Sequence, residues 1–555
     1  MEHQDLVEGH PSTSGDEFPL NVNTLFRHAV RTHPEQHIVY RTVDGGWDRY
    51  TLSECSVRAS TAATVLARLG VEAGDVVGVL DWNSKRHFEL YWGIPALGAV
   101  LLQMNLRLAP ADLAHVTTDS AATVVLVDES LLEVAESIAP LAPNVRHWVV
   151  MTDKSPTEVR TSLPDVIFFE DLMSVSDPLT TWPMITERSA YCGSYTTGTT
   201  GRPKGVFYSH RSLYLHAMTM ASLMEMTNAD CTMLAAPMFH ALSWGLPHAA
   251  VYAGTKVVLP GRYMASDISV LIDAMVAEGV TVINGAPSLY QPMLDHIGEL
   301  DSKPDFRCVR MLCGAAEPPV SLMRELFEHT GAEVIHGYGA TETTALISIN
   351  RVKNSLKESL SDDELWELKR CQGLPLPGME IRVVDADGRT LPSDGHAIGE
   401  ILVKGPGVAT SYFAYHGDDT HFTDGYWRTG DLGKIMPNGY LKLTDRLKDV
   451  IKSGGEWISS IDMENALTTH PDVREAAVVG VPDSKWQERP VALVVLRPES
   501  TTTEQDLRAT LDGLFARWQM PDEIHLLESI ARTSVGKIDK RSIRAQLATN
   551  AATRH

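Results

Sequence analysis

The sequence lacks any long apolar run. None reaches the roughly 18 residues that a membrane span needs, so we expect no membrane span. The N-terminus is acidic and lacks the basic-then-apolar order of a signal peptide, and we interpret residues 1–15 as a loose leader. Cysteine is scarce as well: the chain has six, with no C-x-x-C pair. This excludes a disulfide framework or a zinc site of that spacing and predicts reduced thiols in a cytoplasmic protein.

Basic charge is also in short supply. The chain has 48 Lys and Arg against 71 Asp and Glu, which gives a formal net charge of −23. Such an excess of acid argues against nucleic acid or an anionic membrane as a general partner. It does not argue against nucleotide binding, because a few cations can set the potential within one cleft.

The residues that are present predict a globular protein of more than one domain. Its 555 residues exceed one ordinary domain, and 44% of them are hydrophobic, enough for a sizeable core. Apolar, β-branched stretches at residues 76–80, 122–127 and 309–312 indicate strands, and residues 85–101 show helical spacing. Strands that alternate with helices predict an α/β fold of parallel sheets covered on both faces.

The pattern changes after about residue 395. Short strands at 398–403 and 440–443 in a Gly-rich region predict a small distorted β-barrel. From residue 448 the order strand, helix, strand, strand, helix predicts a compact α+β unit. We therefore divide the chain into residues 1–447 and 448–555. The polar stretch 353–367 predicts one capped surface helix.

A Gly/Thr-rich loop that ends on a lysine, residues 196–205, is the most informative segment. Its backbone N–H groups, threonine hydroxyls and Lys204 suit phosphate oxygens. The spacing is not that of the Walker A loop, since Pro203, Lys204 and Gly205 close it. Alone, such a loop is equally consistent with a solvated turn.

Further motifs follow in a fixed order, at residues 336–343, 426–431, 445–456 and 532–540. With the loop they resemble the adenylate-forming superfamily of acyl-CoA synthetases, peptide-synthetase adenylation domains and luciferases. The resemblance runs from about residue 20 to about residue 547. Residues 372–378 and 516–521 look most like medium-chain fatty-acyl-CoA ligases.

The resemblance implies two half-reactions. A carboxylate attacks the α-phosphorus of ATP, with Mg²⁺, to give acyl-AMP and pyrophosphate, and the thiol of coenzyme A then displaces AMP. Because the first step joins two anions, positive charge and oriented donors are its main need. The large N-terminal part would bind the nucleotide, and the small C-terminal part would be mobile.

Residue roles follow from the same resemblance. Lys537 would be the catalytic lysine, Glu342 the Mg²⁺ ligand and Thr341 a contact of the α-phosphate. Tyr338 would stack on adenine, and Asp431 with Arg446 would hold the ribose. Ala531 stands where the family usually has proline, which we expect to loosen the Lys537 loop modestly. The implied cofactor-binding residues are Thr196, Thr197, Gly198, Thr199, Thr200, Lys204, Ala315, Ala316, Glu317, Gly337, Tyr338, Gly339, Asp431 and Arg446, with Lys452, Gly454 and Gly455 for coenzyme A.

The hinge and the acyl pocket complete the implied site. Lys448 matches the hinge, although a surface lysine in a turn is the plain alternative. His240 would be a catalytic residue and part of the acyl pocket, because it lies in a segment like the one whose aromatic residue moves between half-reactions; it is also consistent with a core histidine. Trp244 and Gly337 would line the pocket, with Trp457 at its mouth. Lys540, near Lys537, is expected to be an ordinary exposed lysine.

Two alternatives stay open. One is an adenylate-forming enzyme that does not use coenzyme A, such as a diazotase that activates nitrite toward an aromatic amine. The other is a nucleotide-binding regulator without catalysis, against which the intact Lys537, Glu342 and Asp431 argue. The sequence does not fix the chain length or aromaticity of the acid, and it leaves open whether the chain is a monomer or a homodimer.

Overall fold

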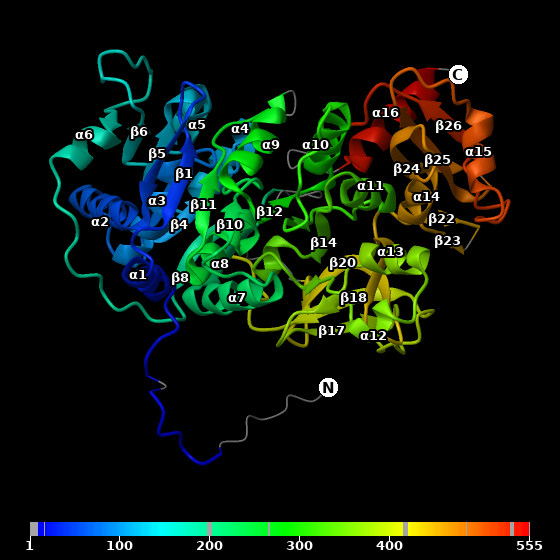
Figure 1. Cartoon of the computed structure of the whole chain (residues 1–555), viewed down its shortest axis with the longest axis horizontal. Helices are drawn as coiled ribbons and strands as arrows, with labels where there is room; N and C mark the ends of the chain where they lie inside the picture. The colour runs from blue at the N-terminus through cyan, green and yellow to red at the C-terminus, as the bar shows by residue number, and fades with distance from the viewer. Residues whose placement is uncertain are drawn as a thin grey trace.

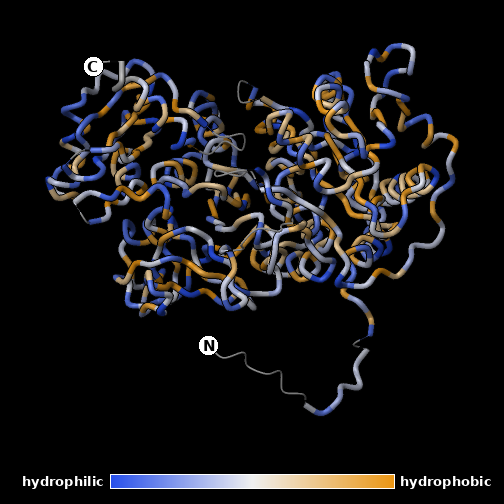
Figure 2. The backbone as a smooth tube through the Cα atoms, turned by 180° about the vertical axis from the view of Figure 1, so that it is seen from behind, coloured by the Kyte–Doolittle hydropathy of each residue, from blue (hydrophilic) through white to orange (hydrophobic). Residues whose placement is uncertain are grey.

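The computed structural model describes residues 9–15, 17–196, 202–264, 267–414, 420–454, 456–483, 485–532 and 538–553. Sheets covered by helices form one side of the molecule, and a small barrel and a compact C-terminal unit lie on the other (Figure 1). Residues 9–15 extend away from this body with exposed side chains (Figures 1 and 2). Within the described ranges, no helix combines the length and apolarity that crossing a bilayer requires.

The first sheet has seven strands in the order β7-β6-β5-β3-β4-β8-β9, parallel except for the last pair. Its strands are β3 (Val76–Leu80), β4 (Val100–Gln103), β5 (Val124–Asp128), β6 (His147–Met151), β7 (Ile167–Phe168), β8 (Ala190–Tyr195) and β9 (Gly205–Ser209). Its helices are α2 (Leu52–Arg68), α3 (Lys85–Gly93), α4 (Pro110–Asp119), α5 (Leu132–Ile138) and α6 (Phe169–Ser174), with short 3-10 turns at Pro95–Leu97, Glu129–Leu131 and Ala139–Leu141.

The second sheet has nine strands in the order β16-β15-β14-β13-β12-β10-β11-β1-β2, and its six central strands are parallel. They are β1 (His37–Arg41), β2 (Trp47–Thr51), β10 (Cys231–Met233), β11 (Lys256–Leu259), β12 (Val282–Gly285), β13 (Arg310–Cys313), β14 (Glu333–Tyr338), β15 (Ser348–Ile349) and β16 (Leu374–Pro375). The accompanying helices are α1 (Val22–Thr32), α7 (His210–Leu223), α8 (Leu246–Ala253), α9 (Ser269–Glu278), α10 (Pro287–Glu299), α11 (Val320–Thr330), α12 (Asn354–Lys357) and α13 (Asp362–Arg370), with the one-turn segments η4 (Ala241–Gly245) and η6 (Thr341–Thr343).

The barrel and the C-terminal unit are mainly antiparallel, so the predicted fold class is confirmed. The barrel strands are β17 (Glu380–Val384), β18 (Gly399–Lys404), β19 (Phe422–Thr423), β20 (Tyr426–Ile435) and β21 (Leu441–Arg446). The C-terminal elements are β22 (Ile451–Ser453), β23 (Glu456–Ile458), α14 (Ser460–Thr468), β24 (Val473–Asp483), β25 (Gln487–Leu496), α15 (Glu504–Leu511), β26 (Glu523–Leu526) and α16 (Lys540–Thr553). The division of the chain at residue 448 stays a prediction.

Two predicted helices differ from the observed ones. Residues 85–101 do not form one helix, because Pro95 begins a 3-10 turn and Gly98 takes a left-handed φ of 79° before β4. Residues 353–367 divide into α12 and α13, since Ser361 caps the second helix through a reciprocal bond with Glu364. Helix α7 begins directly after Ser209, whose side chain caps it by accepting a hydrogen bond from the Ser212 N–H.

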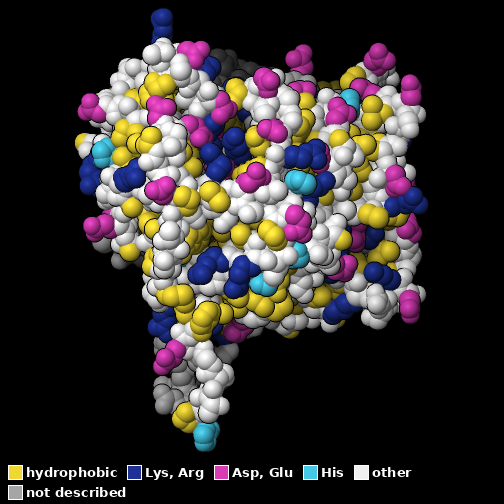
Figure 3. Space-filling model, turned by 60° about the vertical axis from the view of Figure 1, so that its left-hand side comes forward, with side chains coloured by type: hydrophobic (Ala, Val, Ile, Leu, Met, Phe, Trp, Pro, Cys, Tyr) yellow, Lys and Arg dark blue, Asp and Glu magenta, His cyan; other side chains and the backbone are white. Residues whose placement is uncertain are grey.

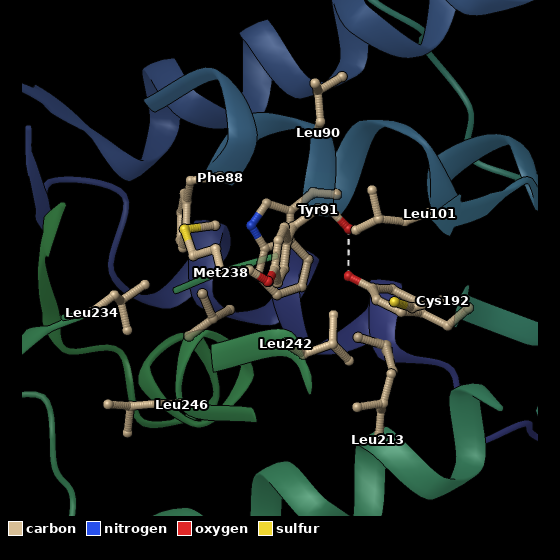
Figure 4. Close-up of a cluster of buried hydrophobic side chains, with 14 of the residues drawn as sticks. Phe88, Leu90, Tyr91, Leu101, Cys192, Leu213, Leu234, Met238, Leu242 and Leu246 are labelled. Carbon is tan, nitrogen blue, oxygen red and sulfur yellow. Dashed lines mark hydrogen bonds between the residues drawn. The ribbon is translucent and has the colours of Figure 1, made fainter. Parts of the chain in front are cut away.

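The largest cluster of buried apolar side chains lies between the two sheets. Phe88, Tyr91, Met238 and Leu242 meet there (Figure 4). The Tyr91 hydroxyl donates to the Met238 carbonyl at 2.7 Å, which attaches the segment before η4 to helix α3. On the surface, acidic and basic side chains are interspersed over the face shown in Figure 3.

Candidate active site

Several of the predicted site residues lie at or just beyond the carboxyl ends of parallel strands. Residues 314–317 follow β13, Tyr338 ends β14, and residues 234–240 follow β10. In open α/β sheets this edge is where ligands bind, because helix N-termini and loops meet there. The Gly/Thr-rich loop leaves the first sheet at the end of β8, so both sheets contribute to the site.

The loop is closed at its neck by Thr196 and Lys204. The Thr196 N–H donates to the Lys204 carbonyl at 2.9 Å, and the Lys204 N–H donates to the Thr196 hydroxyl at 3.1 Å. The Lys204 ammonium donates to His421 Nε2 at 2.7 Å and lies 4.7 Å from the centre of the Tyr412 ring. Thr197, Gly198, Thr199 and Thr200 lie outside the described residues.

Glu342 lies in the single turn η6 and is 8% exposed. Its Oε1 accepts a hydrogen bond from the Tyr412 hydroxyl at 2.7 Å. The carbonyl of the neighbouring Thr341 accepts one from the Tyr208 hydroxyl at 2.7 Å. The turn is tight: a Cβ on Gly339 would lie 1.8 Å from the Ala345 carbonyl oxygen, so only glycine fits.

The surroundings of Glu342 fit Mg²⁺ better than a metal with a cage of protein ligands. Magnesium is usually bound through one or two carboxylates together with substrate phosphates. Over the described part of the chain, no group of three or more His, Cys, Asp or Glu residues could hold a metal ion. A single buried carboxylate, that of Glu342, is compatible with the first arrangement.

The residues predicted for adenine and ribose lie together. The Tyr338 hydroxyl donates to Asp431 Oδ2 at 2.6 Å, and Arg446 Nε is 3.5 Å from Asp431 Oδ1. Asp431 and Arg446 are partners across β20 and β21. Burial, reinforced by the Asp431 charge, raises the pKa of Tyr338 well above its ordinary value, so the phenol stays neutral.

Glu317 has side-chain contacts that the sequence did not predict. Its carboxylate accepts hydrogen bonds from Arg370 at 2.7 Å, Gln372 at 2.7 Å and Asn465 at 2.9 Å. Asn465 belongs to α14, so Glu317 connects the carboxyl edge of the second sheet to the C-terminal unit. Ala315 and Ala316 precede it, and Ala315 has a left-handed φ of 68°.

The acyl-pocket segment contains an uncommon backbone. Ala241, Leu242, Ser243 and Trp244 have φ values of 43°, 57°, 49° and 60°, and Gly245 follows at 75°. Left-handed backbone costs roughly 1–2 kcal/mol per L-residue, so this turn persists only because its surroundings hold it. His240 directly precedes the turn and is partly buried.

Buried polar groups hold the turn. The Ser243 hydroxyl donates to the Ala236 carbonyl at 2.8 Å, and the Asn284 amide donates to the Ser243 carbonyl at 2.8 Å. His216 Nε2 bonds the Trp244 carbonyl at 3.0 Å. The indole of Trp244 lies close to Gly314, which follows β13. A Cβ atom added to Gly314 would lie 3.5 Å from the indole ring and 3.1 Å from the Gly337 carbonyl oxygen.

The C-terminal candidates are dispersed. Lys448 is exposed in the turn between β21 and β22, and Trp457 is 47% exposed on β23, opposite Lys452. Gly454 begins the turn of this hairpin with a φ of 63°, while Gly455 and Lys537 lie outside the described residues. The expectation for Lys540 is wrong: its ammonium pairs with Glu464 at 2.7 Å and its side chain is 12% exposed.

Sequence reasoning missed Tyr412, His421, Ser243 and Asn284. Each acts through a partner that is distant along the chain, as Tyr412 does with Glu342 at a separation of 70 residues. No short motif signals such a contact.

The candidate site lies at the carboxyl edge of parallel strands, and it fits the adenylate-forming class of enzyme that the motifs predict. The chain belongs to the AMP-binding enzyme family. The family model matches residues 26–413, and the model of the AMP-binding enzyme C-terminal domain matches residues 462–537.

Among its relatives, a long-chain fatty-acid–CoA ligase of Thermus thermophilus is 41% identical over 546 residues, covering 97% of this chain and 98% of that protein. A medium-chain fatty-acid–CoA ligase of Ectopseudomonas oleovorans is 34% identical and covers 95% of each chain. The crystal structure of the anthranilate CoA ligase AuaEII with anthranoyl-AMP superposes with a TM-score of 0.83 at 25% identity, covering 96% of this chain and 99% of that one.

Proposed function

We propose that this protein activates a fatty acid with ATP and transfers the acyl group to coenzyme A. The acid's carboxylate attacks the α-phosphorus, and pyrophosphate leaves. The thiolate of coenzyme A then attacks the acyl carbon of the adenylate, the thiol proton passes to solvent, and AMP leaves. The proposal rests on one observation above all: Tyr338, which ends β14 shortly before Glu342, donates to Asp431 of the barrel strand β20, and Arg446 of β21 pairs with the same aspartate.

In this proposal, the neck of the Gly/Thr-rich loop and Lys204 hold the departing phosphates. Asp431 accepts the ribose hydroxyls, and Tyr338 lies against the base. Glu342 would hold Mg²⁺, which when bound offsets phosphate charge. The structure of o-succinylbenzoate CoA synthetase of Bacillus subtilis was solved in complex with ATP and a magnesium ion, and it superposes with a TM-score of 0.76 at 25% identity. Lys537 would supply charge where carboxylate and α-phosphate meet.

A plain aliphatic acid is the proposed substrate class. We assign Trp244 to the floor of the acyl pocket. Its indole is 9% exposed and offers apolar contact to a hydrocarbon chain. Two of the named relatives act on long-chain and medium-chain fatty acids. Burial of hydrocarbon contributes about 0.8 kcal/mol per methylene, so the length of the pocket would select among acids.

The test is a thioester and AMP assay with ATP, coenzyme A and straight-chain acids of graded length. We expect stoichiometric AMP and acyl-CoA, with an optimum at one range of chain length. Parallel reactions contain benzoate, or nitrite with an aminobenzoate and no coenzyme A. AMP release that needs nitrite and no coenzyme A would replace our proposal with the diazotase alternative.

A further inference from the structure

A segment that the sequence motifs do not include, residues 405–413, runs between the two halves of the proposed site. At one end, the Ala409 N–H donates to the Glu342 carbonyl at 2.7 Å, and the Thr344 hydroxyl donates to the Gly407 carbonyl at 2.7 Å. At the other end, the Phe413 N–H donates to the Gly205 carbonyl at 2.8 Å. We call residues 405–413 the strap, because it joins the turn that carries Glu342 to the base of the Gly/Thr-rich loop.

The strap is also fixed by packing. The Phe413 ring stacks on Phe207 of β9 with centroids 4.1 Å apart and an interplanar angle of 19°. Gly205 accommodates this approach, since a Cβ there would lie 3.1 Å from Phe413 Cβ. The position of the strap relative to the loop therefore depends on contacts at several points.

Tyr412 lies at the centre of these contacts and is 7% exposed. Its hydroxyl donates to Glu342 Oε1 at 2.7 Å, and the Lys204 ammonium lies 4.7 Å from its ring centre. The His421 ring stands edge-on to it at 5.7 Å and accepts from Lys204 at 2.7 Å. One buried side chain thus contacts both the proposed metal ligand and the lysine of the proposed phosphate loop.

We propose that Tyr412 is a positioning residue, which holds the Glu342 carboxylate through its hydroxyl and the Lys204 ammonium through its ring. The inference rests on the proposed function, because it assigns Glu342 to the metal and Lys204 to phosphate. Partners that orient a ligating carboxylate typically change metal affinity 10–100-fold when removed. A cation over an aromatic ring is held by the ring quadrupole, which a phenylalanine retains and an aliphatic side chain does not.

The test compares Tyr412→Phe and Tyr412→Leu by calorimetric ATP binding over a Mg²⁺ titration, without acid or coenzyme A, so that no turnover occurs. Tyr412→Phe should raise the half-saturating Mg²⁺ concentration about 10-fold and leave metal-free ATP binding unchanged. Tyr412→Leu should in addition weaken ATP binding at saturating Mg²⁺ by roughly 5-fold, since it also removes the ring beneath Lys204.

The matched control is Tyr440→Phe. It removes a buried hydroxyl that donates to the Arg351 carbonyl at 2.9 Å, away from the proposed site, and should keep the wild-type Mg²⁺ dependence. A Mg²⁺ requirement unchanged in Tyr412→Phe, or raised equally in Tyr440→Phe, overturns the inference. If the inference about Tyr412 is overturned but the wild-type protein makes acyl-CoA, the proposed function remains valid without it. If the wild-type protein binds no ATP in the presence of Mg²⁺, the proposed function itself is wrong. Should Tyr412→Leu not fold, Tyr412→Phe decides by itself.

Discussion

At the scale of single residues, three buried histidines contribute to the pH dependence of stability. Burial lowers the pKa of His87 to about 4, of His210 to about 4 and of His248 to about 3. The unfolded chain binds these protons near pH 6.5, so the free energy of unfolding falls as the pH drops below about 6.5 toward the folded-state values.

At pH 5 each such histidine lowers the free energy of unfolding by up to about 2 kcal/mol. Urea unfolding at pH 7.5 and at pH 5 measures this difference in the free energy of unfolding. We expect His210→Gln to flatten the dependence relative to the wild type. The control His396→Gln changes an exposed histidine and should keep the wild-type pH dependence of the free energy of unfolding. If the wild type, His210→Gln and His396→Gln all show the same pH dependence, His210 does not contribute as proposed.

Lys537 gives the sharpest catalytic prediction at this scale, and it rests on the sequence resemblance. Lys537→Ala should slow adenylation by on the order of 10²-fold or more, because a charge contact of the transition state is lost. Thioester formation from a supplied acyl-adenylate should largely survive. Equal losses in both half-reactions would show that Lys537 does not have the assigned role. Lys537→Arg keeps the positive charge and tests how much of the adenylation rate depends on charge alone.

Among the elements, the left-handed turn η4 connects backbone strain with substrate choice. Ser243→Ala removes the bond to the Ala236 carbonyl, which still accepts from Asn83 at 2.9 Å, so we expect only about 1 kcal/mol of lost stability. The larger effect should be a weaker preference among acid chain lengths, because Trp244 is held less firmly. Thioester assays over the acid series measure it.

The control for that variant is Ser348→Ala. Ser348 is also fully buried, and its hydroxyl donates to a backbone carbonyl, that of Gln372, at 2.7 Å in β15. Its stability loss should be similar and its acid preference unchanged. If both variants keep the wild-type preference, η4 does not set specificity.

The elements also show how far sequence reasoning reaches. Strands such as β3 and β5 were predictable, because runs rich in β-branched residues have few alternatives to a buried parallel strand. The turn η4 was not, because nothing in Ala-Leu-Ser-Trp favours positive φ, and the turn is held in part by Asn284 and His216, which lie far from it along the chain. Likewise, the chemistry of Glu342 and Asp431 suggested a nucleotide site, whereas the contacts of Tyr412 and Glu317 exist only in the folded chain.

At the scale of the whole molecule, the proposed hinge predicts a separation of the two half-reactions. Lys448→Pro fixes φ near −65° and removes one N–H in the turn that follows β21. Provided that the adenylating state tolerates this φ, the variant should still make acyl-AMP and release pyrophosphate in the first turnover. Transfer to coenzyme A should fail, because the turn cannot change its dihedral angles. Single-turnover pyrophosphate and thioester measurements decide; small, parallel losses would mean that Lys448 is a surface lysine.

The contact between Glu317 and Asn465 predicts a second effect at this scale. Asn465→Asp places a carboxylate against Glu317 Oε1, where the amide now donates at 2.9 Å. Repulsion should displace the C-terminal unit, so the ratio of the two half-reaction rates should change several-fold and proteolysis in the 447–450 turn should accelerate. The same charge change at the exposed Asn354 serves as the control. Unchanged rates and cleavage would mean that this contact does not hold the unit.

Asp445 lies just before the proposed hinge and binds the first residue of helix α14 beyond it. Its Oδ2 accepts from both the backbone N–H and the hydroxyl of Ser460, at 2.7 Å and 2.6 Å, and the aspartate is 1% exposed. These two hydrogen bonds therefore connect strand β21 to helix α14 across the 447–450 turn, which is the proposed hinge. In the proposed mechanism, a rotation of the C-terminal unit about this turn would have to break these bonds or move Asp445 together with α14, and breaking them would raise the barrier to the exchange of nucleotide for thiol.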